Sequence, residues 1–134
     1  MTSTWFTDKQ YAEIVEFYEA RVTRDLVPVI QKEVLKDSSC SSKTFLDIGP
    51  GGGALTRELA PSFNHVDVIE PNRNYTQSLK PFNIISHEPM QDAKIEAAIY
   101  DLILCCHVFY HIPSDQWENV RHFFCYNCNR YESN

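Results

Sequence analysis

The chain has 134 residues, enough for one domain with one hydrophobic core. Its composition, 43% hydrophobic and 22% charged, excludes an intrinsically disordered chain. Twelve basic residues against eighteen acidic ones give a net charge of −6, and the basic residues form no cluster that could follow a phosphate backbone. We therefore expect a folded protein with no nucleic-acid partner.

Neither a membrane-spanning segment nor a signal peptide is predicted. The longest uncharged stretch, residues 102–114, is much shorter than the roughly 20 residues that cross a bilayer. The first six residues lack the positive and apolar regions of a secretory signal. The chain has five cysteines, an odd number, which disfavours a framework of disulfides. These features predict a cytoplasmic protein with reduced thiols and no membrane partner.

Residues 1–42 form the first of three predicted regions. Apolar residues recur at spacings of three and four over residues 8–35, and Pro28 interrupts the pattern, which predicts two amphipathic helices. A serine-rich loop leads to the second region, residues 43–124, where helical and strand-like segments alternate. The last region, residues 125–134, is a polar tail.

The alternation in the second region predicts an α/β fold. Four strands are expected, in residues 44–48, 65–70, 83–87 and 100–107. Helices are expected after the first, second and fourth strands, starting at Ala54, at Pro71 and after a cap at Ser114. The fourth strand is an almost continuous apolar run, the type that is buried on both faces of a parallel sheet. We therefore expect a doubly wound parallel sheet of about four strands.

All four glycines of the protein lie between the first strand and its helix, at positions 49, 51, 52 and 53. Glycine permits turns that bring a ligand against the main chain. Gly49, Gly51 and Ala54 satisfy the G-x-G-x-x-G/A pattern of dinucleotide-binding folds. Asp47 instead favours S-adenosylmethionine, because its carboxylate can meet an ammonium group and would repel a pyrophosphate. A nicotinamide-dependent oxidoreductase is the alternative.

Glu70 ends the second strand, 21 residues after Gly49. A carboxylate at this point is well placed to accept hydrogen bonds from both hydroxyls of a ribose. Both nucleotides contain a ribose. Glu70 is therefore a predicted ligand residue under either interpretation of the glycine loop.

Three segments resemble motifs of the class I S-adenosylmethionine-dependent methyltransferases. Residues 45–53 resemble the first motif, residues 68–70 the second and residues 100–113 the fourth. The resemblance implies a Rossmann-like sheet in the order 3-2-1-4, S-adenosylmethionine as cofactor, and methyl transfer to a small-molecule acceptor. The N-terminal helices and residues 86–89 also resemble the histamine N-methyltransferase branch. A non-catalytic cofactor-binding module derived from such an enzyme is the second interpretation.

The resemblance also implies roles for single residues. The methionine part of the cofactor is expected at Asp47, Gly49, Gly51 and Gly53, and the ribose at Glu70. Many relatives carry an acidic residue soon after the third strand that contacts adenine. The candidates at that point of this chain are His87, Glu88, Gln91 and Asp92. Of these, His87 is taken as the cofactor-binding residue.

Three side chains at the end of the fourth strand are the catalytic candidates. Ligands bind beyond the carboxyl ends of the strands in an open parallel sheet, so His107, Tyr110 and His111 are expected to face the cofactor. Methyl transfer is an in-line displacement that depends on holding both reactants in place. Either histidine can also take a proton from the acceptor, and His107 is expected to contact the cofactor as well. Shaping the pocket wall is their alternative role.

The end of the chain departs from the family's pattern. A complete domain of this family has seven strands, and no fifth strand is predicted after the Ser114 helix. The fourth strand would then be a sheet edge, through which the chain is expected to self-associate. His122, Cys125 and Cys128 have the spacing of three metal ligands, but a structural zinc site needs four, so no metal is predicted.

Overall fold

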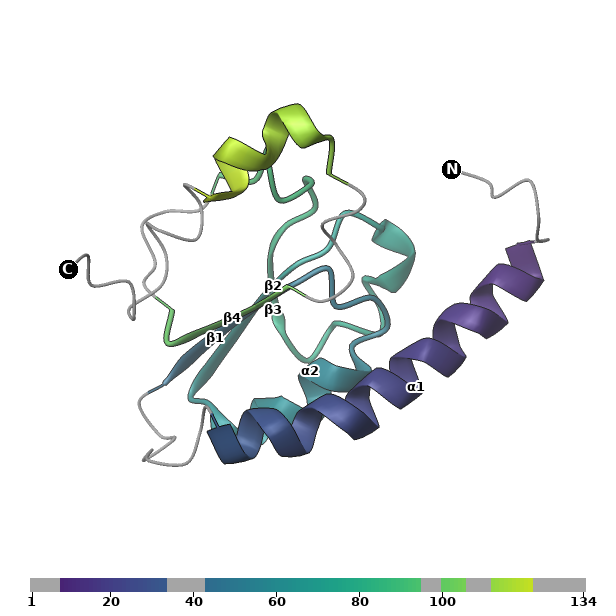
Figure 1. Ribbon diagram of the computed structural model, residues 1–134, viewed down its shortest axis with the longest axis vertical. Helices are drawn as coiled ribbons and strands as arrows, with labels where there is room; N and C mark the ends of the chain where they lie inside the picture. The colour runs from purple at the N-terminus through teal and green to yellow at the C-terminus, as the bar shows by residue number, and fades with distance from the viewer. Residues whose placement is uncertain (1–7, 34–42, 95–99, 106–111, 122–134) are drawn as a thin grey trace. The chain divides into compact units, whose positions relative to one another are not determined.

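The computed structural model divides into two compact units, Met1–Ser38 and Ser39–Asn134 (Figure 1). The residues that it describes are 8–33, 43–94, 100–105 and 112–121. The first unit contains one helix, and the second contains the sheet. No helix in the described ranges is both long enough and apolar enough to cross a membrane.

The helix of the first unit, α1 (Asp8–Glu33), replaces the two helices that the sequence predicted. Pro28 lies inside α1 and does not end it. A proline in a helix removes one backbone hydrogen bond and costs roughly 3 kcal/mol. That cost is local, and the turns on either side keep their own hydrogen bonds. The prediction of two helices is therefore wrong.

The second unit is built on a four-stranded parallel sheet in the order β3-β2-β1-β4, which confirms the predicted topology (Figure 1). The strands are β1 (Thr44–Ile48), β2 (His65–Ile69), β3 (Asn83–Ser86) and β4 (Leu102–Cys105). The bounds of β1 are those predicted. The strands β2 and β3 each end one residue earlier than predicted, and the predicted end of β4 lies outside the described residues.

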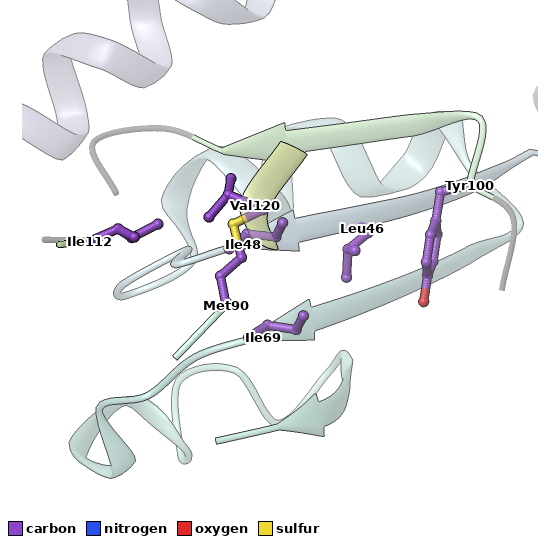
Figure 2. Close-up of a cluster of buried hydrophobic side chains, with 7 residues drawn as sticks. All are labelled: Leu46, Ile48, Ile69, Met90, Tyr100, Ile112 and Val120. Carbon is purple, nitrogen blue, oxygen red and sulfur yellow. The ribbon is translucent and has the colours of Figure 1, made fainter. Parts of the chain in front are cut away.

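The two faces of the sheet have different cores, because successive side chains of a strand point to opposite faces. Seven buried side chains form the core of one face: Leu46, Ile48, Ile69, Met90, Tyr100, Ile112 and Val120 (Figure 2). On the other face, Phe45 packs against Phe63, with ring centroids 4.9 Å apart. The helix α2 (Ala54–Leu59) contributes the fully buried Leu59 and Thr56. Burial of both faces matches the continuous apolar character of the strands.

A polar network lies near the amino ends of the strands. The Tyr100 hydroxyl donates a hydrogen bond of 2.6 Å to Asp67 Oδ2, and the Asn83 amide donates one of 2.9 Å to Oδ1. Asp101 accepts a hydrogen bond of 2.9 Å from the backbone nitrogen of Thr44. Burial and the Asp67 carboxylate raise the pKa of Tyr100. Tyr100 and Asp101 therefore have a structural role at the amino ends of the strands.

Two of the predicted helices take a different form. After β2 the chain forms the short 3-10 helix η3 (Arg73–Tyr75) and a series of turns, where an α-helix starting at Pro71 was predicted. The Asn72 side chain accepts a hydrogen bond from the backbone nitrogen of Asn74 and so caps the start of η3. After β4, Ser114 is the first residue of η5 (Ser114–Gln116) and not a cap, and an α-helix follows directly over residues 117–121. The helix predicted at Pro71 and the cap predicted at Ser114 are therefore wrong, whereas the helix predicted after β4 is confirmed.

Candidate functional site

The glycine loop follows β1 and contains three residues with left-handed backbone. Gly49, Gly51 and Gly53 have φ angles of 68°, 58° and 83°, which L-residues with side chains rarely adopt. A Cβ atom at Gly53 would also lie 2.8 Å from Leu79 Cδ2, so this glycine is required for packing as well. The backbone nitrogen of Gly49 donates a hydrogen bond of 2.8 Å to the carbonyl oxygen of Ile69, which ties the loop to β2.

Glu70 reaches back from the end of β2 to this loop. Its Oε2 accepts a hydrogen bond of 3.0 Å from the backbone nitrogen of Gly51. Its Oε1 accepts one of 2.9 Å from the backbone nitrogen of Asn72. The residue is 6% exposed, so its carboxylate is buried at the carboxyl end of β2. Two residues that were predicted to bind one ligand are thus in direct contact.

Asp47 is a buried carboxyl group on β1. The residue is 2% exposed, and its Oδ2 accepts a hydrogen bond of 2.7 Å from the Thr56 hydroxyl. Burial raises the pKa of Asp47 to about 7, the Thr56 hydrogen bond opposes this rise, and the charge of Glu70 adds to it. The carboxyl group is therefore close to half ionised at neutral pH.

Sequence reasoning did not identify Thr56 or Arg57, which both act on this loop from α2. Arg57 Nη1 donates a hydrogen bond of 2.8 Å to the carbonyl oxygen of Gly52. The hydroxyl of Thr56 is turned toward β1. Their position in the sequence could have identified them, because side chains in the first turn after a glycine loop lie close to that loop and to the end of the preceding strand.

His87 follows β3 and lies beside Glu70. Its Nδ1 is 2.9 Å from the backbone carbonyl oxygen of Glu70, and because a carbonyl only accepts, Nδ1 is the donor. In the neutral ring this leaves Nε2 as an acceptor. The structure therefore brings together the predicted cofactor residues of the first three strands, namely Asp47, the three glycines, Glu70 and His87.

The other adenine candidates have different surroundings. The residue Glu88 is exposed, and its backbone nitrogen donates a hydrogen bond of 3.0 Å to Ser86 Oγ. Within the described ranges, Oε1 of Gln91 is buried and has no hydrogen-bond partner. Asp92 is exposed.

The three catalytic candidates, His107, Tyr110 and His111, lie outside the described residues. The last described residue before them is Cys105, which pairs with Ile48 at the carboxyl end of the sheet. The proposed metal-ligand triplet at 122–128 also lies outside the described residues. Elsewhere, the parts of the chain that the structure describes contain no group of three side chains that could hold a metal ion.

Comparison with known proteins identifies the family. The sequence matches the methyltransferase-domain family over residues 18–126, which is most of the chain. The chain therefore belongs to this family. None of the curated proteins matches the sequence. The resemblance to the histamine N-methyltransferase branch stays a prediction.

Solved structures of methyltransferases share the fold. The plantazolicin methyltransferase BpumL, solved with a desmethylPZN analog and SAH, has a TM-score of 0.67 at 19% identity, covering 94% of this chain and 52% of its own. A putative S-adenosyl-L-methionine-dependent methyltransferase from Methanococcus maripaludis has a TM-score of 0.64 at 17% identity, covering 92% and 62%. Magnesium protoporphyrin IX methyltransferase from Synechocystis PCC 6803, solved with bound SAM, has a TM-score of 0.61 at 16% identity, covering 82% and 57%. The chain thus spans between half and two-thirds of the length of these three structures.

Proposed function

We propose that this chain binds S-adenosylmethionine at the carboxyl ends of β1 and β2 and serves methyl transfer to a small-molecule acceptor. The observation that carries the proposal is the hydrogen bond from the Gly51 backbone nitrogen to Glu70 Oε2. It joins a left-handed glycine turn to a buried carboxylate, and this pairing provides both close backbone approach and an acceptor for ribose hydroxyls. Membership in the methyltransferase-domain family, and neighbours solved with SAM or SAH, support the same cofactor.

The proposed roles divide the cofactor among the strands. The glycine loop receives the methionine part, and the Asp47 carboxyl group meets its ammonium. Glu70 accepts from the ribose hydroxyls. His87 lies beside Glu70, where its Nε2 is available to the adenine side of the ligand. These assignments use only groups at the carboxyl ends of the strands, where ligands of open α/β sheets bind.

A nicotinamide-dependent oxidoreductase is less well supported. A pyrophosphate bound at the loop would lie near two buried carboxyl groups, those of Asp47 and Glu70. Burial raises the pKa of Asp47 to about 7 and the charge of Glu70 adds to this rise, so a bound dianion would add further repulsion. A ligand with a positive charge is favoured instead, and the sulfonium and ammonium groups of S-adenosylmethionine both qualify.

The reaction itself is proposed at the end of β4. The acceptor atom forms a bond to the methyl carbon while the carbon–sulfur bond breaks, and the sulfur keeps the electron pair and becomes a neutral thioether. An acceptor that carries a proton passes it to a base, for which His107 and His111 are the candidates. Tyr110 is the third catalytic candidate, and its proposed role is to position the acceptor. A non-catalytic cofactor-binding module is the second candidate function, because the site residues that the structure describes are all ones proposed for the cofactor.

We also propose a cytoplasmic location and self-association through β4. The odd number of cysteines, which disfavours a framework of disulfides, supports the location. In the described part of the sheet, no strand pairs with the outer side of β4, whose residues Leu102, Ile103 and Leu104 are half-buried. Such an apolar edge favours pairing with a second copy of the chain. Sedimentation that shows a stable monomer at high protein concentration would contradict this.

Calorimetry with S-adenosylmethionine, its demethylated product SAH and NAD tests the cofactor. We expect the first two to bind and NAD not to bind, and binding of NAD alone would overturn the proposal. Glu70→Ala should weaken the binding by roughly 1.5–3 kcal/mol for each charge-assisted hydrogen bond that is lost. Glu58→Ala is the matched control, because Glu58 is an exposed glutamate on α2.

Transfer of a labelled methyl group to a panel of small amines, hydroxyls and thiols separates an enzyme from a binding module.

A further inference from the structure

Thr56 is a fully buried residue of α2 whose hydroxyl bonds a neighbouring strand. Its relative exposure is 0%, and its Oγ1 lies 2.7 Å from Asp47 Oδ2. Threonine hydroxyls inside helices commonly bond the carbonyl oxygen one turn earlier or face solvent. Here the hydroxyl donates to a carboxyl group on β1. This contact joins α2 to the residue that precedes the glycine loop.

Among the described residues, Asp47 has apolar neighbours on both adjacent strands, Val68 of β2 and Leu104 of β4. Burial raises its pKa and the charge of Glu70 raises it further, whereas the hydrogen bond from Thr56 lowers it. The hydroxyl of Thr56 is therefore the group that favours the ionised form of Asp47.

We propose that Thr56 is a positioning residue of the cofactor site, whose hydroxyl orients the Asp47 carboxyl group toward the ammonium group of the ligand and favours the ionised form. The inference rests on the proposed function for its ligand, but the link between Thr56 and Asp47 rests on the hydrogen bond alone. By donating to Oδ2, the hydroxyl leaves Oδ1 as the oxygen that can meet the ligand. A carboxyl group with this orientation and charge attracts the ligand's ammonium group.

The contact makes ligand binding depend on pH in a predictable direction. The pKa of Asp47 is about 7, so half of the molecules carry a protonated Asp47 at that pH and lack the charge that the ligand requires. Affinity should therefore rise with pH up to about 7 and then level off. The midpoint of this pH dependence is the pH at which Asp47 is half ionised. Loss of the Thr56 hydroxyl should raise the midpoint by about one pH unit, because a hydrogen bond to the ionised form is removed.

The experiment compares Thr56→Val with Thr56→Ser. Valine keeps the shape of threonine without the hydroxyl, whereas serine keeps the hydroxyl without the methyl group. S-adenosylmethionine binding is measured by calorimetry between pH 5.5 and pH 7.5, below the range near ~8 where an α-amino group loses its charge. We expect the wild-type pH profile in the serine variant. In the valine variant, affinity should still be rising at pH 7.5 and should be about fivefold weaker than wild type at pH 7.

Equal midpoints in the wild type and Thr56→Val would overturn the proposal, as would an equal shift in both variants. In an Asp47→Asn background, Thr56→Val should leave the pH profile unchanged, because Thr56 acts through Asp47. If Thr56→Val does not fold, the pair Thr56→Ser and Thr56→Ala gives the same comparison of hydroxyl against none.

The pH dependence of urea unfolding gives a readout that needs no ligand. Absence of S-adenosylmethionine binding in the wild type at every pH would refute the proposed function, and the effect of Thr56 on Asp47 would still be measured by unfolding. An unfolding profile that is the same in wild type and Thr56→Val would refute the role of Thr56, whether or not the cofactor binds.

Discussion

Replacing Asp47 by Asn should change how the stability of this protein depends on pH. Asparagine has nearly the same shape and keeps an oxygen that can accept the Thr56 hydrogen bond, but it cannot ionise. In the wild type, burial raises the pKa of Asp47 from the model-compound value of 3.8 to about 7. The folded state therefore binds this proton more tightly than the unfolded state does.

The sign and size of the effect follow from this difference. Between pH 3.8 and pH 7 the folded state holds more protons than the unfolded state, so stability falls as pH rises through this range. Each pH unit contributes about 1.4 kcal/mol. Over about three pH units, the wild type should lose roughly 4 kcal/mol of unfolding free energy that the Asn variant keeps. Below pH 3.8 and above pH 7 the two proteins should differ by a constant amount.

Urea unfolding between pH 4.5 and pH 8 measures the difference in unfolding free energy between the wild type and the Asn variant. The contributions of distant titrating groups cancel in this difference. Asp115→Asn is the control, because Asp115 is exposed and its removal should leave the slope unchanged. A wild-type-minus-variant difference that is the same at all pH values would refute the reasoning. It would mean that Asp47 is hydrated in the folded protein or that a cation neutralises it.

Two further predictions concern the glycine loop and the polar network. Gly51→Val should abolish cofactor binding and lower stability by roughly 1–3 kcal/mol, since a β-branched residue is strained at a φ of 58°. Gly52→Ala is the control for the loss of a glycine. Calorimetry measures cofactor binding and melting curves measure stability in both variants. Normal binding in the valine variant would show that the loop does not touch the ligand. Tyr100→Phe should lower the free energy of unfolding by roughly 1–3 kcal/mol, because the buried Asp67 loses a donor. Cofactor affinity should stay at the wild-type value, and a large loss of affinity would contradict the structural role of Tyr100.

Local patterns in the sequence predicted the four strands, and the resemblance to the methyltransferase family predicted their order. The limits of β1 were predicted to the residue, because an apolar run and a glycine turn are local features that lie within a few residues. The positions of Asp47, Gly51 and Glu70 at the carboxyl ends of β1 and β2 followed from the same pattern. Local pattern was less reliable for helices. Pro28 was read as a break although its cost is confined to one turn, and the helix predicted at Pro71 is a 3-10 turn.

Only the tertiary structure decided how the site residues meet. The contact of Gly51 with Glu70 spans 19 residues, and the contact of Asp47 with Thr56 joins a strand to a helix. Both depend on the register of β1 against β2 and on the packing of α2 over one face of the sheet, which no local pattern specifies. Burial of Asp47 is a consequence of the same packing, and this burial raises its pKa to about 7. The electrostatic character of the site therefore comes from removal of water by residues distant in sequence.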